Sequence, residues 1–308
     1  MAYINCYDDN YYTPGEHLSE LFQELVVKPF ENPDSLTQAW INHVRNRDFK
    51  YHRETILEQG RTNFDESFRG LTGKEKVLIY CLHYMPMHLF SSYHIFTKHL
   101  PSVNNKVVFV DFGCGPLTSG IAFWASTRQS DITYVGIDSS QGMRDKAREI
   151  NRHGPYESEP FFRKGRVTSD WNRLFQSLDD YIMRGDQTQI IFNFCYFLAS
   201  KTLNIGDLSN CLTQIVGKYS QHKMCMVYQN PIKSPDLHRN WFTVKGELST
   251  FRGQITEPNE EKFSCDWFRL QNGRLVWRKS LPIDIYFDIL SYEPSGYFGD
   301  PLELSYIF

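Results

Sequence analysis

Three residues near the middle of the chain have the types and spacing of a ligand-binding turn. Asp111, Gly113 and Gly115 follow directly on Val107 to Val110, a continuous run of apolar β-formers. Such a run is typical of a central parallel strand that is covered on both faces. Glycines take backbone angles that other residues avoid, and they let a ligand approach the main chain closely. Because Ile121 to Ala125 then read as the start of a helix with free N–H groups, the segment predicts a nucleotide-type cofactor site.

The same spacing disfavours two common kinds of nucleotide site. A dinucleotide fingerprint needs a third glycine three residues after the second, but Pro116 follows Gly115 and the next glycine is Gly120. A P-loop would end in Gly-Lys-Ser/Thr, and the segment up to Gly120 has no lysine. The carboxylate of Asp111 would repel a pyrophosphate. It would instead suit a ligand with an ammonium group or a positively charged sulfur.

A second acid ends the next predicted strand. Ile132 to Ile137 is a short apolar segment, and Asp138 follows it. In doubly wound folds, an acid about twenty residues after the glycine turn accepts hydrogen bonds from the ribose hydroxyls. Ser139 comes next, and a predicted helix begins at Met143.

These elements, in this order, resemble the class I S-adenosylmethionine-dependent methyltransferases, whose first motif is an acid and Gly-x-Gly at the end of the first strand. The resemblance covers about Lys106 to Tyr228. It implies S-adenosylmethionine as the cofactor and an α/β, Rossmann-like, mostly parallel seven-stranded sheet flanked by helices, with an antiparallel C-terminal hairpin. The cofactor-binding positions predicted on this basis are Asp111, Gly113, Gly115, Pro116, Asp138, Ser139, Met143, Asp170, Trp171, Asn193, Phe194 and Tyr84.

The third predicted strand supplies two of these positions. It lies within Glu159 to Trp171 and ends at Asp170 and Trp171. In the resembled family a polar residue here reads the adenine amino group, and a bulky neighbour packs on the ring, as Met143 would from its helix. An equally good reading makes Asp170 the N-cap of a helix that starts near Asn172.

The fourth predicted strand, Gln189 to Leu198, contains a partial match to another motif. Asn193 to Tyr196 stands where methyltransferases of nucleic-acid amino groups carry Asp/Asn-Pro-Pro-Tyr/Phe/Trp, but only the outer two residues agree. Without the prolines, the rigid loop that positions a target amine is not encoded. Tyr196 remains a candidate for lining the pocket of the methyl acceptor. Met224 to Tyr228 reads as the fifth strand.

Residues 1–104 are predicted to form a helical N-terminal cap, and residues 105–308 the methyltransferase domain. Helices are expected at His17 to Val27, Leu36 to Asn46 and Lys74 to His99, the last of them kinked or broken at Pro86. The aromatic residues of that third helix favour packing on the sheet. The resemblance also implies that some of them, among Tyr84, His88 and Tyr93, cover the methionine end of the cofactor.

No metal site is predicted. His83, His88, His94 and His99 have no carboxylate or cysteine nearby in the sequence, and i,i+5 spacing does not place two ligands on one helical face. The seven cysteines include no CxxC pair, which favours reduced, mostly buried thiols.

After Asn230-Pro231 the pattern changes. A polar helix or loop is expected at Pro235 to Leu248, and a loop or insertion at Phe251 to Glu261. Phe263 to Arg278 alternates and turns at Asn272-Gly273, which predicts a β-hairpin. Ile283 to Leu290 reads as a further strand.

Composition predicts a cytoplasmic protein without a membrane partner. The chain has 308 residues, a mean hydropathy of −0.46 and a net charge of −3, with neither a membrane-length apolar run nor a signal peptide. The charge gives no global field for nucleic acid. A local basic stretch consists of Arg144, Lys146, Arg148, Arg152, Arg163, Lys164 and Arg166.

The sequence therefore predicts methyl transfer from S-adenosylmethionine, an in-line displacement in which positioning does most of the work. A small-molecule acceptor is the leading expectation. The alternatives are RNA, DNA or protein as the acceptor, and a non-catalytic S-adenosylmethionine-binding partner or sensor. The sequence selects neither a catalytic base nor an oligomeric state.

Overall fold

The structure is a computed structural model of the chain. The described residues are 3–8, 10–33, 36–101, 106–127, 131–153, 164–168, 170–182, 188–201, 203–232, 237–248, 251–253, 259–271 and 274–294.

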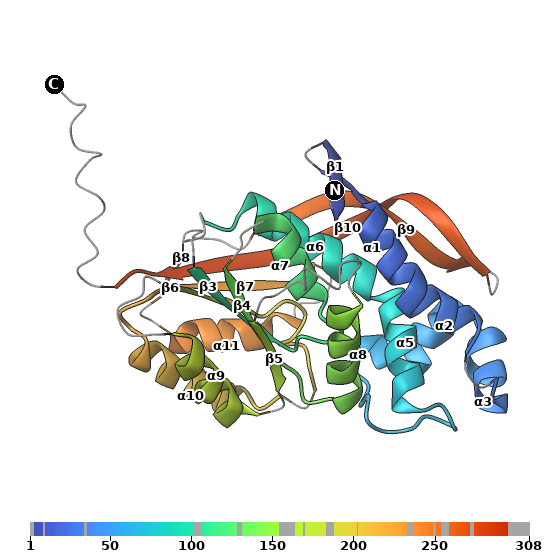
Figure 1. Ribbon diagram of the computed structural model, residues 1–308, viewed down its shortest axis with the longest axis horizontal. Coiled ribbons are helices and arrows are strands. Elements are labelled where there is room, and N and C mark those ends of the chain that lie inside the picture. Colours follow the sequence, from blue (N-terminus) through green and yellow to red (C-terminus); the bar gives the residue numbers. More distant parts are fainter. Residues whose placement is uncertain are drawn as a thin grey trace.

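A ten-stranded mixed sheet forms the centre of the molecule (Figure 1). Its order is β1-β2-β9-β10-β7-β6-β3-β4-β5, and β8 pairs with β10 beside this path. The strands are β1 (Ile4–Asp8), β2 (Tyr11–Pro14), β3 (Lys106–Phe112), β4 (Ile132–Ile137), β5 (Lys164–Thr168), β6 (Thr188–Asn193), β7 (Lys223–Pro231), β8 (Arg252–Gly253), β9 (Asn259–Gln271) and β10 (Arg274–Tyr292).

The five strands at one side of the sheet, β5-β4-β3-β6-β7, are parallel. Asp111 at the end of β3 pairs with Gly136 on one side and with Asn193 on the other. The carboxyl ends of β3, β4 and β6 therefore meet at one edge of the sheet, where doubly wound folds bind ligands.

The helices cover both faces of the sheet (Figure 1). They are α1 (Glu16–Phe22), α2 (Lys28–Glu31), α3 (Gln38–Trp40), α4 (Phe49–Tyr51), α5 (Gly73–His83), α6 (Met85–Lys98), α7 (Thr118–Thr127), α8 (Gln141–Arg152), α9 (Trp171–Tyr181), α10 (Ile205–Lys218) and α11 (Arg239–Glu247). Three π-helical turns lie between the N-terminal helices, at Gln23–Val27, Ile41–Arg45 and His52–Ile56.

Strand β3 shows why the sequence reads as a buried strand. Val107 and Phe109 point into the core formed with the N-terminal helices and α5 to α8. Val108, Val110 and Phe112 point into the core formed with α9, α10 and α11. Because both faces of β3 are buried, its apolar residues form a continuous run and do not alternate with polar ones.

The expected break near Pro86 is confirmed. Helix α5 starts with a capping box, in which Thr72 and Glu75 bond each other's backbone N–H groups, and it ends at His83. Helix α6 follows after Tyr84, with Pro86 in its first turn, where a missing N–H group costs nothing.

The Rossmann-like fold class is confirmed, but the sheet has ten strands where seven were expected. The predicted hairpin is β9–β10, and its turn at Asn272-Gly273 falls outside the described residues. The strand predicted at Ile283 to Leu290 is the second half of β10, which also pairs with β7. A short stretch within the predicted loop after Phe251, β8, also pairs with β10.

The N-terminal segment, expected to be helical, begins with strands. β1 and β2 form a hairpin, and β2 pairs in parallel with β9 at the sheet edge. There was little indication of β2 in the sequence, because this strand is only four residues long and its partner β9 lies about 250 residues further along the chain.

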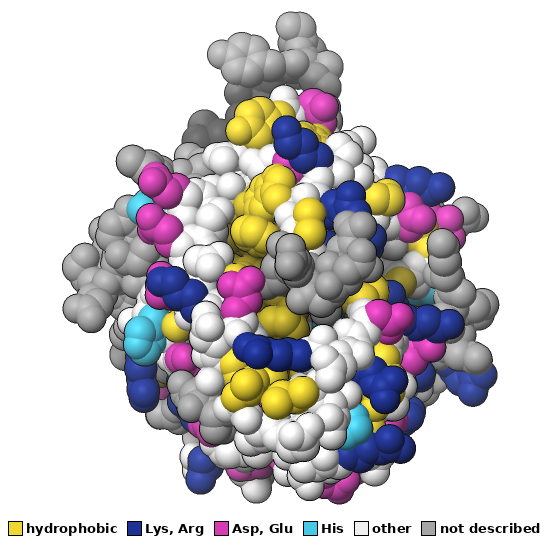
Figure 2. All heavy atoms as spheres, turned by 90° about the vertical axis from the view of Figure 1, so that its right-hand side faces the viewer, with side chains coloured by type: hydrophobic (Ala, Val, Ile, Leu, Met, Phe, Trp, Pro, Cys, Tyr) yellow, Lys and Arg dark blue, Asp and Glu magenta, His cyan; other side chains and the backbone are white. Residues whose placement is uncertain are grey.

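Positive and negative side chains are interspersed on the face shown in Figure 2, around a band of apolar ones. No charge of one sign dominates this face. Within the part of the chain that the structure describes, no helix has both the length and the apolar composition needed to cross a bilayer.

Candidate functional site

The turn after β3 has the backbone that its glycines predict. Gly113 and Gly115 have φ angles of +65° and +50°, values that favour glycine. A Cβ added at Gly113 would lie 2.4 Å from the Phe197 ring. At Gly115 the nearest atom to such a Cβ is 3.9 Å away. Gly113 is therefore required by packing, whereas Gly115 leaves a hollow.

A pocket that is open at its mouth surrounds this turn, with a cavity volume of about 30 Å³. The turn residues Gly113 to Pro116 form one wall, and Thr118 and Ser119 at the start of α7 continue it. Tyr80 of α5 and His88 of α6 lie on another wall, with Cys195 and Tyr196 from the segment after β6.

Asp138 holds the turn in place. One carboxylate oxygen accepts a hydrogen bond from the Gly115 N–H at 3.0 Å, and the other accepts from the Ser140 N–H at 2.9 Å. Burial raises the pKa of Asp138 to about 6, although these two N–H groups lower it. A carboxylate has about four acceptor positions, so it retains capacity for further donors.

Asp111 lies beneath the turn and outside the pocket lining. It is 1% exposed. Its carboxylate accepts from the Tyr134 hydroxyl at 2.8 Å and from the Asn193 side-chain amide at 2.7 Å. Burial raises the pKa of Asp111 to about 7 against these two hydrogen bonds. Its contribution to the pocket is electrostatic and structural.

A stacked pair of rings forms the wall opposite the turn. The imidazole of His88 and the ring of Tyr196 are parallel within 15°, with centroids 3.6 Å apart. The Tyr80 hydroxyl lies 3.1 Å from His88 Nδ1, and the Tyr196 hydroxyl lies 2.9 Å from Ser91 Oγ. Burial lowers the pKa of His88 to about 3, so this imidazole is neutral at physiological pH.

Two hydroxyls on α7 differ in their bonding. Ser119 Oγ lies 3.2 Å from Ser92 Oγ, and Ser92 accepts in turn from the Gln229 side chain at 2.8 Å. Thr118 Oγ1 is buried and has no hydrogen-bond partner among the described residues. An orphaned hydroxyl in a pocket wall is a ready partner for a polar ligand atom.

Other predicted site residues lie around the pocket but are not part of its lining. Asp170 caps α9, accepting from the Arg173 N–H at 2.9 Å, so the capping interpretation is confirmed. Trp171 begins α9 and packs against the core ring of Phe112. The remaining members are Ser139, exposed just after Asp138; Met143, buried in α8; Phe194, buried against Phe112; and Tyr84, which stacks on Tyr80.

Sequence reasoning missed five residues of the lining. Tyr80 precedes the predicted Tyr84 by one helical turn, so i,i+4 spacing would have indicated it. Cys114, between the glycines, and the pair Thr118 and Ser119, at the helix start, lie where a ligand approaches the turn. Cys195 is another member of the lining and had no independent signal in the sequence.

Three of the four described side chains of the basic stretch are engaged within the protein, and the fourth, Arg152, is exposed. Arg144 is buried and donates to the backbone carbonyls of Asp138 and Ser139 at 2.7 and 2.6 Å. Lys146 donates to the Leu25 carbonyl and pairs with Glu149. Arg148 pairs with Asp145 at 2.9 Å. These cations are therefore not arranged to bind a phosphate backbone. Arg163 and the side chains of Lys164 and Arg166 are outside the description.

Comparison with known proteins gives a likeness of fold. Solved structures with matching folds include several methyltransferases. A precorrin-6Y C5,15-methyltransferase from Geobacter metallireducens matches 65% of this chain and 88% of its own length, with a TM-score of 0.39 and 10% identity. Magnesium protoporphyrin IX methyltransferase from Synechocystis, solved with bound S-adenosylmethionine, matches 85% of this chain and 100% of its own, with a TM-score of 0.38 and 10% identity.

A fibrillarin/Nop5p complex is similar over 68% of this chain and 82% of that one, with a TM-score of 0.38 and 11% identity. At these values the likenesses do not bear on cofactor or acceptor. No protein-family model matches the sequence. No curated protein matches it either.

Proposed function

We propose that this chain binds S-adenosylmethionine at the glycine turn and transfers its methyl group to a small-molecule acceptor. The observation that carries the proposal is the pocket around Gly113 to Ser119, at the carboxyl ends of β3 and β6, with Asp138 bonded to the turn. This is the place at which a Rossmann-like sheet binds nucleosides.

Two features of the pocket fit the amino-acid end of such a cofactor. Gly115 leaves a hollow beside the main chain, and the Thr118 hydroxyl has no partner among the described residues. A charged amino or carboxylate group would complete the hydrogen bonding of Thr118 in this pocket wall. The nearby Asp111 and Asp138 favour a ligand of positive charge.

The adenosine end is assigned from the family resemblance. Asp138 would accept from the ribose hydroxyls with the acceptor positions that Gly115 and Ser140 leave free. Ser139 and Met143 on one side, and Asp170 and Trp171 on the other, would flank the adenine. Phe194 and Asn193 support this region from within the core.

The bound cofactor would supply an electrophilic methyl group on a positively charged sulfur. The protein would hold the acceptor in line with it and exclude water, and such positioning is worth several kcal/mol of the barrier. His88 serves this purpose because burial keeps its pKa at about 3, so no imidazolium repels the sulfonium. The Tyr80 hydroxyl and His88 offer neutral hydrogen-bonding groups to an acceptor.

A small acceptor fits better than a nucleic acid. The pocket is bounded by the Tyr80, His88 and Tyr196 rings rather than lying in an open groove. Arg144, Lys146 and Arg148 bind carbonyl or carboxylate groups of the protein itself, and polymer recognition would need free cations.

Isothermal calorimetry with S-adenosylmethionine and S-adenosylhomocysteine tests the proposal. Wild type is expected to bind both with one site per chain. Asp138→Asn keeps the shape but removes the charge, and it should weaken binding by about ten- to a hundredfold, the ~1.5–3 kcal/mol of a charged hydrogen bond. The matched control is Asp131→Asn, at an exposed acid that precedes β4.

Turnover is then measured as S-adenosylhomocysteine released with a panel of small acceptors and with RNA. Release with a small acceptor supports the proposal. RNA-dependent release that falls steeply with salt would show that the acceptor is RNA and not a small molecule. Tight binding without turnover on any acceptor would indicate a sensor, and absence of cofactor binding would refute the whole assignment.

A further inference from the structure

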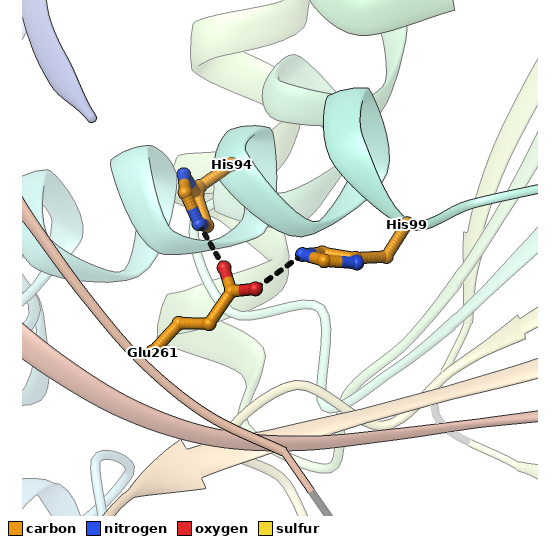
Figure 3. Close-up of side chains that lie close together, drawn as sticks. All are labelled: His94, His99 and Glu261. Atoms are coloured by element: carbon orange, nitrogen blue, oxygen red, sulfur yellow. Dashed lines mark hydrogen bonds and ion pairs between the residues drawn. The ribbon is translucent and has the colours of Figure 1, made fainter. Parts of the chain in front are cut away.

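A carboxylate lies between two histidines at the far end of α6 from the glycine turn. His94 is in the last turn of α6, His99 is the residue that ends the helix, and Glu261 comes from β9 (Figure 3). One Glu261 oxygen contacts His94 Nε2, and the other lies 2.8 Å from His99 Nε2. The ligand atoms of all three residues lie within 4.8 Å of one another.

We propose that His94, His99 and Glu261 form a binding site for a divalent transition-metal ion of the zinc type. The sequence argued against a metal because no carboxylate stands near these histidines and i,i+5 spacing separates them on a helix. The fold removes both objections. His99 lies where α6 ends, so its side chain is free of helical spacing, and β9 supplies the acid from 162 residues away.

The bonding of His99 favours a metal over a simple hydrogen-bonded pair. Although Nε2 of His99 is 2.8 Å from the carboxylate, it is buried and makes no hydrogen bond within the described residues. The contact is thus close but poorly directed for an N–H donor. A metal ion needs ligand atoms that face a shared space, and Figure 3 shows the Nε2 atoms of His94 and His99 facing the two oxygens of the Glu261 carboxylate.

His94 is prepared as a ligand. Its side chain is fully buried. Its second nitrogen, Nδ1, lies 2.7 Å from the Tyr12 hydroxyl. Metal-binding histidines almost always bond through their other nitrogen in this way, which fixes the ring and the tautomer. Phe263 stacks on the same ring, with centroids 4.7 Å apart.

The donor set selects the class of ion. Two imidazoles and one carboxylate suit zinc and neighbouring transition metals, whereas magnesium and calcium prefer oxygen ligands alone. Zinc ligands lie at about 2.0–2.2 Å from the ion. Glu261, whose side chain is 30% exposed, can draw back from the histidines to admit the ion. The exposure of Glu261 and His99 also leaves an entry path and room for a water ligand.

Such an ion would tie α6 to β9. Helix α6 carries His88, Ser91 and Ser92 one to two turns earlier, in or next to the cofactor pocket, so the site would fix the helix that bears the pocket wall. The inference does not depend on the proposed methyl transfer, because its readouts are metal content and stability.

The test uses the full chain in a Cys6→Ser background, because Cys6 is the exposed one of the seven cysteines and an exposed thiol competes for zinc. Equilibrium dialysis against ZnCl₂ is expected to give one zinc per chain with a Kd of about 1 µM or tighter. Cobalt in its place should give a visible absorption spectrum. Zinc should raise the Tm, and MgCl₂ should not.

Glu261→Gln is expected to weaken zinc binding at least about tenfold, and Tyr12→Phe about ten- to a hundredfold through His94. Glu260→Gln, the exposed neighbour on the same strand, is the matched control and should bind as the parent does. His99→Gln is the second ligand variant if Glu261→Gln fails to fold. Equal zinc binding by the folded ligand variant and the parent, or no zinc binding by the parent, would overturn the site and leave a His–Glu–His ion-pair contact only.

Discussion

Two buried threonines differ in where they lie. Thr118 and Thr188 are 5% and 1% exposed, and each has a hydroxyl without a hydrogen-bond partner among the described residues. Thr118 lines the pocket, whereas Thr188 starts β6 at the opposite end of the parallel strands. The unpaired hydroxyl of Thr118 can bind a ligand in the pocket, whereas that of Thr188 lies away from it.

The isosteric change Thr118→Val should therefore weaken S-adenosylmethionine binding by about tenfold, the ~1.5 kcal/mol of a hydrogen bond to a charged group. Thr188→Val should leave binding unchanged. Calorimetric titration of both variants measures the difference. Equal affinities for the two would mean that Thr118 does not contact the ligand.

Asp111 predicts a particular pH dependence of stability. Its folded pKa is about 7, raised by burial, and its unfolded value is about 3.9. Between these values the folded state binds more protons than the unfolded state, so the free energy of unfolding falls as the pH rises from about 4 to about 7. The limiting slope for one group is about 1.4 kcal/mol per pH unit.

Urea unfolding at several pH values between 4.5 and 7 checks this, with Asp111→Asn for comparison. The variant has no carboxyl group that titrates at this position. Its free energy of unfolding, measured relative to that of wild type, should therefore increase as the pH rises. Asp138, whose pKa of about 6 is also raised by burial, remains in both proteins and cancels in the difference. A pH-independent difference would show that Asp111 titrates alike in both states.

At the scale of elements, one acid joins the N-terminal segment to the start of α8. Asp65 accepts from the Ser140 hydroxyl at 2.9 Å and from the N–H groups of Gln141 and Gly142 at 3.1 and 3.2 Å. A carboxylate at a helix N-terminus satisfies free donors and interacts favourably with the helix dipole. The segment before α5 thus fixes the helix that follows the predicted ribose-binding acid.

Removing that carboxylate in Asp65→Ala should cost about 1 kcal/mol of stability and speed amide exchange at the first turn of α8. Asp48→Ala is the control. Asp48 caps a different helix, α4, by accepting a 2.8 Å hydrogen bond from the Tyr51 N–H. Hydrogen exchange read by mass spectrometry distinguishes them. Unchanged protection of α8 in Asp65→Ala would show that Ser140 is a sufficient cap.

The elements also show what the sequence was able to predict. β3 and β4 were visible because strands buried on both faces are continuously apolar, and the break at Pro86 was visible because proline cannot continue a helix. The place of Glu261 between two histidines was not visible. It depends on the packing of β9 against α6, and no local pattern encodes a contact across 162 residues.

At the scale of the whole molecule, the N-terminal third is part of the pocket and of the sheet. Tyr80 and His88 come from it, and Tyr12 of β2 is buried beside β9. The apolar face of the sheet that α5 and α6 cover belongs to one continuous core. A boundary at residues 104 and 105 would therefore divide the core, even though it separates the predicted cap from the predicted methyltransferase domain.

Residues 105–308 alone are thus expected to lack a cooperative urea unfolding transition and to bind the dye ANS through their uncovered face. Coexpression with residues 1–104 as a separate chain should restore both the transition and cofactor binding, because the missing wall and edge strand return. Tryptophan fluorescence during unfolding measures the first property and calorimetry the second. If residues 105–308 unfold cooperatively and bind S-adenosylmethionine unaided, the N-terminal segment is a lid added to an independent domain, and Tyr80 and His88 serve the acceptor and not the cofactor.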